Sequence, residues 1–303
     1  MSQFTELVKR NIRVYMRDRG AVFFSLLSMI IVLGLMLFFL GDMNINSLTG
    51  VLADFPDRDP EQDRKNAELF VMLWTCGGIL SINAATVTLA VYSSMISDRT
   101  KGVLNSVYTA PVSRLTISAA YVVTAWICSV IICTLTLAIS EIYCIIQGGD
   151  IFSFVSHLKL IGMIMANSFA YAALMYLAAV LVKTEGAWSG IGTVVGTLVG
   201  FLGGIYLPIG SLAEEIASAL KFFPVIYGAK MFRSIMTEDI CGELFENAPE
   251  ALKTEYLEVM GVELDFFGTE ISNVGCVAAL LACGIVFLVA GVLVTKAMSK
   301  RGR

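Results

Sequence analysis

The sequence predicts an all-α membrane protein with six transmembrane helices, and three observations carry that prediction. Hydrophobic residues make up 57% of the 303 residues and charged residues only 15%, whereas about a quarter of a soluble domain is charged. Six stretches without a charged side chain are each long enough to cross a bilayer core, which needs about 20 apolar residues as helix. Basic residues also gather in alternate connecting segments, as positive-inside insertion requires.

The charge-free stretches define the expected spans. They cover 20–41, 69–97, 115–140, 160–182, 186–213 and 271–295. Within them we place spans at about 21–40, 70–95, 117–140, 160–182, 187–207 and 273–295. The whole chain, 1–303, then forms a single transmembrane domain with outer segments at 42–68 and 208–271. Helices are expected because lipid offers no partner for open backbone groups, and the short alternating segments of a barrel are not seen.

The distribution of charge orients the expected bundle. With the N-terminus in the cytoplasm, the inner segments hold thirteen of the 21 basic residues but only four of the 25 acidic ones. This asymmetry has the sign of the positive-inside rule, so both termini are expected to be cytoplasmic. The apolar run Ala21 to Leu40 is too long for the core of a signal peptide and is interpreted as a retained first span.

Residues 3–18 have the pattern of an amphipathic helix. The apolar side chains recur at helical spacing, and four basic side chains lie off that stripe. The apolar positions are Phe4, Leu7, Val8, Ile12 and Tyr15, and the basic ones are Lys9, Arg10, Arg13 and Arg17. Such a helix is typical of the membrane interface. The alternative is a basic flank that only sets topology.

The segment 96–116, between the second and third spans, is the most informative connection. Charged residues and Gly102 come first, and a short apolar helix face follows at Val103, Leu104, Val107 and Tyr108. Pro111 is expected to end this helix, and Ser113 to cap the third span. An apolar face on a short cytoplasmic helix needs a cover. Either the membrane interface or a docked partner protein could supply it.

Glycines recur every fourth residue in the fifth span, at Gly192, Gly196, Gly200 and Gly204. Small residues at this spacing let two helix backbones approach closely in lipid. The close approach could occur within one chain, or at a dimer seam or gate, and the sequence leaves both open.

Two short helices are expected between Pro208 and residue 236, separated by Pro224. Neither is long enough to span the bilayer, so they suggest a re-entrant or interfacial pair on the outer side. Pro249 to Met260, followed by Gly261, predicts one external helix. The acidic, proline-containing segment 42–68 is expected to be a solvated loop.

Several chemistries find no support in the sequence. There is no P-loop motif and no hydrolase motif, and His157 is the only histidine. We therefore expect no catalytic residue, no metal site and no cofactor bound by this chain. The net charge of −4 argues against nucleic acid as a partner. Glu141 is expected at the outer boundary of the third span, and Asn83 and Asn167 are expected to bond neighbouring helices.

The order of these elements resembles the ABC-2 type permeases, the membrane subunits of type V ABC exporters. The resemblance covers nearly the whole chain. It is most specific at Ser97-Asp98-Arg99-Thr100-Lys101-Gly102 and at Thr109-Ala110-Pro111-Val112-Ser113-Arg114. Phe222-Phe223-Pro224-Val225-Ile226-Tyr227, with Phe232-Arg233 after it, is similar to a second family segment. The chain departs from the family at Ala119-Ala120, where many members have Gly-Lys, and its Asp98-Arg99 run is short. Both departures bear on the subfamily.

The resemblance implies a transport subunit without a nucleotide site of its own, in the plasma membrane of a prokaryote. Cytoplasmic ABC ATPase subunits carrying ATP and Mg would drive export, and a second permease copy or a homologous permease would complete the pathway. The implied ATPase-coupling residues are Asp98, Arg99, Lys101, Gly102, Leu104, Val107, Tyr108, Pro111 and Arg114. The glycine row would lie at the dimer seam or pathway, and Phe223, Pro224 and Tyr227 in the re-entrant helices.

The apolar spans and modest outer segments fit an amphiphilic substrate such as a drug, a peptide antibiotic or a lipid-linked compound. An ion-coupled secondary transporter or channel is the main alternative, although charge-free spans and the lack of an internal repeat speak against it. A non-transporting scaffold or sensor is the third hypothesis. Substrate identity, and homodimer against heterodimer, stay open at this point.

Overall fold

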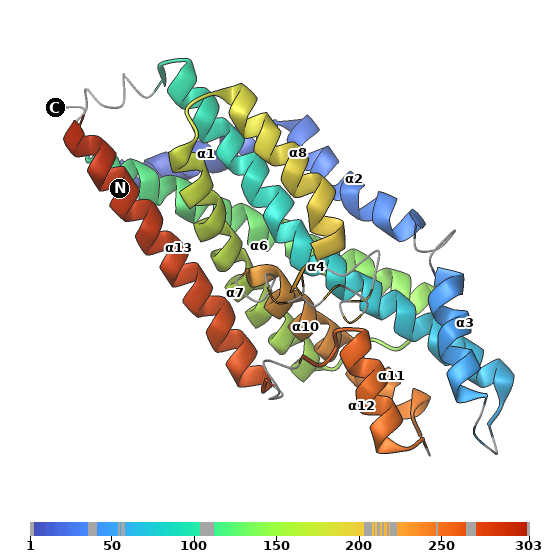
Figure 1. Cartoon of the computed structure of the whole chain (residues 1–303). Coiled ribbons are helices and arrows are strands. Elements are labelled where there is room, and N and C mark those ends of the chain that lie inside the picture. The colour runs from blue at the N-terminus through green and yellow to red at the C-terminus, as the bar shows by residue number, and fades with distance from the viewer. Residues whose placement is uncertain are drawn as a thin grey trace.

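The computed structural model describes residues 3–35, 41–53, 55, 58–103, 112–202, 208, 210, 213, 215–216, 218, 223–246, 248–264 and 271–301. This part of the chain is helical and contains no strand (Figure 1). Its helices are α1 Gln3–Arg17, α2 Arg19–Leu35, α3 Gly41–Leu52, α4 Pro60–Thr100, α6 Arg114–Ile146, α7 Phe154–Leu181, α8 Glu185–Leu202, α10 Pro224–Met236, α11 Glu238–Leu244, α12 Glu250–Val259 and α13 Asn273–Arg301.

Four helices of the described chain, α4, α6, α7 and α13, are long and apolar enough to cross a membrane. They contain the expected second, third, fourth and sixth spans, apart from residue 182, which caps α7. α2 and α8 coincide with the expected first and fifth spans. Their described lengths are 17 and 18 residues, and residues 36–40 and 203–207 lie outside the described part. The all-helical class is confirmed, with four apolar spans.

Helix α4 is the centre of the bundle. It has 41 residues, which corresponds to a length of about 60 Å, roughly twice the thickness of a bilayer core. In its apolar stretch of 18 residues, 94% of the residues are buried. Asn83 donates from Nδ2 to Thr136 Oγ1 on α6 at 2.7 Å, and Asn167 on α7 donates to the Ser81 carbonyl at 3.0 Å. Both asparagines therefore bond neighbouring helices, which confirms the prediction made for them.

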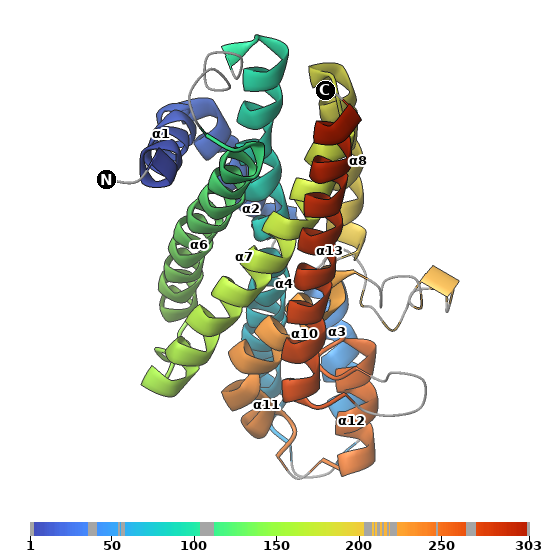
Figure 2. The same cartoon turned by 90° about the vertical axis from the view of Figure 1, so that its left-hand side faces the viewer.

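Helix α13 packs lengthwise against α7 (Figure 2). An ideal Cβ on Gly284 would lie 2.8 Å from the Phe169 ring, and one on Gly291 would lie 2.6 Å from the Tyr176 ring. The two glycines are seven residues apart on α13, and the two aromatic residues are seven residues apart on α7. Each ring therefore fills the space that a side chain on α13 would need. The opposite face of α13 is apolar and exposed, as at Ile285, Val289 and Leu293. Such a face suits lipid.

The segment 42–68 is not the solvated loop expected from its charges. It contains α3 and the first turns of α4. Ile45, Leu48 and Leu52 are buried against α4 because they fall on one face of α3. Arg58 forms a two-pronged ion pair with Asp63, with its closest N–O distance 2.6 Å. The burial of this apolar stripe is what orders a segment whose composition favoured solvation.

Helix α10 lies inside the bundle, against α4, α7 and α13. Twelve of its 13 residues are buried, so neighbouring helices enclose it. Most of the first helix of the expected pair, between Pro208 and Phe223, lies outside the described residues. The expected second helix, Val225 to Met236, is confirmed, and Pro224 is its first residue. α12 confirms that residues 250–259 form a helix, and Gly261 after it has a φ of 66°. Trp74 Nε1 donates to the carbonyl of Met260 at 2.7 Å and so anchors the end of α12.

The two ends of the bundle differ in what they contain. α1 and the C-terminal end of α13 lie at one end, and α3, α11 and α12 lie at the other (Figures 1 and 2). We call the first the coupling end, after the coupling residues that the family resemblance implies there, and define it by Arg10, residues 98–103, residues 112–121 and residues 179–185. Both chain termini therefore lie at the same end of the bundle. α4 runs from this end to the other (Figure 1).

Candidate functional site: the coupling end

Asp98, in the last turn of α4, joins three helices. Its carboxylate accepts from both terminal nitrogens of Arg10 on α1, at 2.5 and 3.0 Å, and from the Tyr121 hydroxyl on α6, at 2.5 Å. Asp98 is 9% exposed. The hydrogen bond with this carboxylate raises the pKa of Arg10 above its ordinary value. The amphipathic helix α1 is thereby fixed to the end of α4.

The packing face of α1 follows its predicted stripe only in part. Val8, Asn11 and Tyr15 are its buried residues, and they lie on one face, at spacings of three and four. Arg10 stands beside this face, although the sequence pattern placed it on the solvated side. α1 is therefore held in two ways, by the burial of its apolar face and by the ion pair of Arg10 with Asp98. The helical nature of residues 3–17 is confirmed.

Arg99 binds a different helix from its neighbour. Its Nη1 donates to the carbonyls of Val182 at 2.9 Å and Ala179 at 3.3 Å. These carbonyls lie at the C-terminal end of α7, where helix carbonyls lack intrahelical partners and a cation is favoured. Arg99 therefore caps α7.

Thr100 extends the same set of contacts to α8. Its hydroxyl donates to Glu185 Oε1 at 3.0 Å. Hydrogen bonds from Ser97 and Thr100 lower the pKa of Glu185 below its ordinary value. The last turn of α4 thus contacts α1, α6, α7 and α8 through successive side chains.

The chain leaves α4 at Lys101 and Gly102. Lys101 is exposed, Gly102 has a φ of 73°, and the Val103 side chain is 40% exposed. Four proposed coupling residues, Leu104, Val107, Tyr108 and Pro111, lie outside the described residues. Beyond them, the Ser113 hydroxyl accepts from the Thr116 amide at 3.0 Å, which confirms the predicted cap of α6. Arg114 is the first residue of that helix.

The glycine row of α8 is divided between two surroundings. A Cβ on Gly192 would meet the Leu89 side chain of α4 at 3.4 Å, and Gly200 is buried. A Cβ on Gly196 would meet no atom within 4 Å, nor would one on Gly190. Gly204 lies outside the described residues. One face of α8 therefore packs on α4, while another small-residue face is open in the single chain.

The segment around Pro224 is tightly enclosed. Tyr227 is buried, whereas Phe223 is exposed at the N-cap. A Cβ on Gly228 would lie 2.5 Å from Asn167 Oδ1 and 2.8 Å from Ser81 Oγ. Sequence reasoning passed over this glycine because it stands alone, without the repeated spacing that drew attention to α8.

Arg233 is fully buried on the same helix. Its guanidinium carbon lies 4.2 Å from the centroid of the Trp74 ring, a cation–π contact. Its backbone also abuts Gly77, where a Cβ would lie 2.9 Å from the Arg233 amide nitrogen. Such a close approach of α10 to α4 needs a residue without a side chain.

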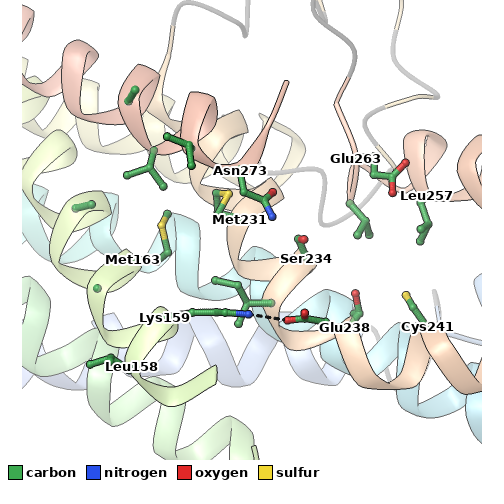
Figure 3. A pocket seen from close by; sticks show the side chains of 18 of the residues that line it. Leu158, Lys159, Met163, Met231, Ser234, Glu238, Cys241, Leu257, Glu263 and Asn273 are labelled. Atoms are coloured by element: carbon green, nitrogen blue, oxygen red, sulfur yellow. Dashed lines mark hydrogen bonds and ion pairs between the residues drawn. The ribbon is translucent and has the colours of Figure 1, made fainter. Parts of the chain in front are cut away.

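A cavity of about 850 Å³ opens at the end opposite the coupling end, between α7, α10, α11, α12 and α13. Figure 3 shows Lys159 and Glu238 pointing toward each other at its edge, and their closest atoms are 3.1 Å apart. Met163 and Met231 line it further in. The cavity is thus mainly apolar, with one lysine and two glutamates, Glu238 and Glu263, in its described lining (Figure 3). Its volume falls in the range of small-molecule sites.

Glu141 lies near the end of α6 and is paired. Its Oε2 is 3.0 Å from His157 Nε2, and its Oε1 accepts from the Phe152 amide at 3.2 Å. These contacts tie the α6–α7 connection together. Among the described residues there is no group of three His, Cys, Asp or Glu side chains that could hold a metal ion.

Comparison with known proteins gives the family. The family model described as ABC-2 type transporter matches residues 2–237, which include α1 to α10 and both segments described above. A search of curated proteins found no match. Because the family model covers more than half of a chain whose helices form an apolar bundle, this protein belongs to the ABC-2 type transporter family and is a membrane permease component of an ABC transporter.

Proposed function

We propose that this chain is the permease subunit of an ATP-driven exporter that moves an amphiphilic substrate out of the cytoplasm of a prokaryote. It has six spans, with α2 and α8 as the first and fifth, and both termini are cytoplasmic. A separate ABC ATPase binds ATP and Mg and docks at the coupling end. A second permease, identical or homologous, completes the transport pathway.

The network around Asp98 is the observation that carries this proposal. It joins α1 and α6 to the end of α4, while Arg99 and Thr100 join α7 and α8 to the same turn. A partner that displaces α1 or the 96–116 segment would therefore pull on four helices at once. Because the interior of a packed bundle deforms little, such a pull moves helices as units.

Helix α4 is proposed to transmit movement from one side of the membrane to the other. Its 41 residues run without interruption from the coupling end to α3 and α11. A rigid rod of this length moves its outer end when its inner end moves. The outer cavity of Figure 3 borders α10 and α11, both of which contact α4. Movement of α4 is therefore expected to reshape this cavity during transport.

The open small-residue face of α8 supports pairing with a second permease. Gly190 and Gly196 leave the helix backbone accessible, which is the feature that close helix–helix contact in lipid requires. The pathway would then run along the seam between α8 helices.

The direct test of the proposal is capture of the ATPase. The tagged full chain, purified in mild detergent from its native membrane, is expected to bring down a P-loop ATPase. Lys101→Glu reverses an exposed charge at the coupling end and is expected to lower the recovered ATPase severalfold without changing the thermal midpoint. Lys65→Glu, at the far end of α4, is the matched control, because Lys65 is also exposed.

Asp98 and Arg99 are less suitable for this test, since both side chains are bound within the chain. Equal ATPase recovery from Lys101→Glu and Lys65→Glu would remove the docking assignment.

The alternative function is an ion-coupled transporter or channel. The observation in its favour is the pair of buried cations on α10, Lys230 and Arg233, because buried charges often mark ion paths. Lys230 donates to the side chain of Asn273, and Arg233 lies over Trp74. Substrate transport by the purified chain in ATP-free liposomes would support this alternative and contradict the exporter.

A further inference from the structure

A basic pocket and an apolar groove meet at the coupling end, on the side of the bundle formed by α6, α7 and α13. The pocket has a volume of about 420 Å³ and is lined by Arg99, Arg114 and Lys183, together with residues of α13. The groove has a volume of about 840 Å³ and is lined by apolar residues such as Val122, Trp126 and Leu288. Ser118 lines both, so the two spaces adjoin.

The pocket is polar and the groove beside it is apolar. Tyr176, which lines the groove, hydrogen-bonds through its hydroxyl to Thr295, which lines the pocket, at 2.7 Å. Polarity therefore changes from one space to the adjoining one, from three cations to hydrocarbon. A ligand that fits both spaces carries an anionic head and an apolar body.

The charge of the pocket is one-sided. Its described lining contains three cationic side chains and no carboxylate. Two carboxylates of the coupling end bind other groups: Asp98 accepts from Arg10 and Tyr121, and Glu185 accepts from Thr100. Residues 104–111, which connect α4 to α6, contain no acidic residue. An anion is thus favoured here by charge.

The length of the groove matches one leaflet of a bilayer. On α13 it extends from Val292 to Leu281, which is roughly 16 Å at the rise of an α-helix. Half of a hydrocarbon core is about 15 Å thick. The outer face of α13 beside the groove is apolar and exposed, so the groove is reachable from lipid.

From this geometry we infer that the pocket and groove form a binding site for an anionic phospholipid, with its phosphate at Arg114 and Lys183 and an acyl chain along α6 and α13. The site lies on the α13 side of the bundle, and α7 and α4 lie between α13 and α8 (Figure 1). It is therefore distinct from the proposed seam between α8 helices, whereas its cationic residues belong to the coupling end, and its place in the bilayer rests on the proposed function. The proposed orientation places this lipid in the inner leaflet.

Trp126 allows a direct test. It lines the groove with its ring held by a hydrogen bond from Nε1 to the Met165 carbonyl at 3.0 Å, while the other two tryptophans, Trp74 and Trp188, are buried. The full chain is reconstituted in phosphatidylcholine vesicles containing brominated phosphatidylglycerol or brominated phosphatidylcholine. The part of the quenching that is lost in the Trp126→Phe variant comes from Trp126, and it measures the lipid in the groove. Brominated phosphatidylglycerol is expected to quench at several-fold lower mole fraction than brominated phosphatidylcholine.

Two variants distinguish binding of the lipid headgroup from binding of the acyl chain. Lys183→Gln is expected to lower the preference for phosphatidylglycerol by roughly fivefold, the effect of about one cation near an anionic lipid. Lys65→Gln, at the other end of the molecule, is expected to leave the preference unchanged. Ala119→Phe fills the groove and is expected to reduce quenching by both lipids. Equal quenching by both headgroups in the unaltered chain, or equal effects of Lys183→Gln and Lys65→Gln, would overturn the site.

Discussion

Asp98 and Arg99 are neighbours in the sequence, yet their side chains bind different helices. Asp98 holds α1 and α6, and Arg99 caps α7. Consecutive residues of a helix point about 100° apart, so adjacent positions at the end of a central helix naturally reach separate neighbours. The charged run after the second span, which the sequence suggested as a docking surface, thus holds the permease itself together at its coupling end.

The ion pair between Asp98 and Arg10 leads to a prediction at the residue scale. Asp98→Asn is expected to lower the free energy of unfolding by about 1–2 kcal/mol, because it removes the anion from a two-pronged pair whose arginine can partly rehydrate. Thermal unfolding in detergent measures the loss. In a double-mutant cycle with Arg10→Gln, the two losses are expected to overlap by at least about 0.5 kcal/mol. Strictly additive losses would show that the pair contributes nothing.

At the scale of elements, isolated glycines place α10 inside the bundle. Gly77 of α4 admits the backbone of Arg233, and Gly228 of α10 admits the side chains of Asn167 and Ser81. Both contacts bring helices closer than any other residue would permit. A helix of 13 residues with 12 of them buried gains its stability from this packing, since so short a helix is marginal by itself.

Gly228→Ala tests this packing. The added methyl would meet Asn167 Oδ1 and Ser81 Oγ at less than normal contact distance, so the variant is expected to lose about 1–3 kcal/mol of stability through overpacking. Gly242→Ala on α11 is the control, because its Cβ would meet no atom within 4 Å. That control is expected to be neutral or to gain up to about 1 kcal/mol from helix propensity. Similar thermal midpoints for the two variants would argue against the tight contact at Gly228.

At the scale of the whole molecule, the bundle has two unlike sides. The α13 side is apolar and exposed along its length, whereas the α8 side carries small and hydroxyl residues such as Gly190, Thr193 and Gly196. Lipid covers the first kind of surface readily, while the second suits close contact with another helix. We therefore propose that α13 faces lipid and that α8 faces a second permease.

Gly196→Leu tests the assignment of the seam. Because a side chain at this position meets no atom of its own chain, the variant is expected to fold with an unchanged thermal midpoint. Its side chain would project into a partner helix, so cross-linked dimer in native membranes is expected to fall severalfold. Gly242→Leu, on an exposed position far from α8, is expected to leave the dimer intact. An undiminished dimer in Gly196→Leu would move the seam to another face.

The sequence by itself determined the membrane class, the positions of the long apolar helices and of α1, α10 and α12, and several helix ends. Charge-free length reports insertion directly, and Ser113, Pro224 and Gly261 act through local backbone chemistry that needs no distant partner. The family segments were also visible as local patterns. Only the tertiary structure decided that residues 41–52 are an ordered helix rather than a loop.

Long-range contacts likewise decided the site. The pairing of Asp98 with Arg10 joins positions 88 residues apart, and the two glycine contacts of α10 depend on which helices meet. Local patterns carry no information on either. Local rules therefore set the elements, and side-chain packing between remote segments set their neighbours.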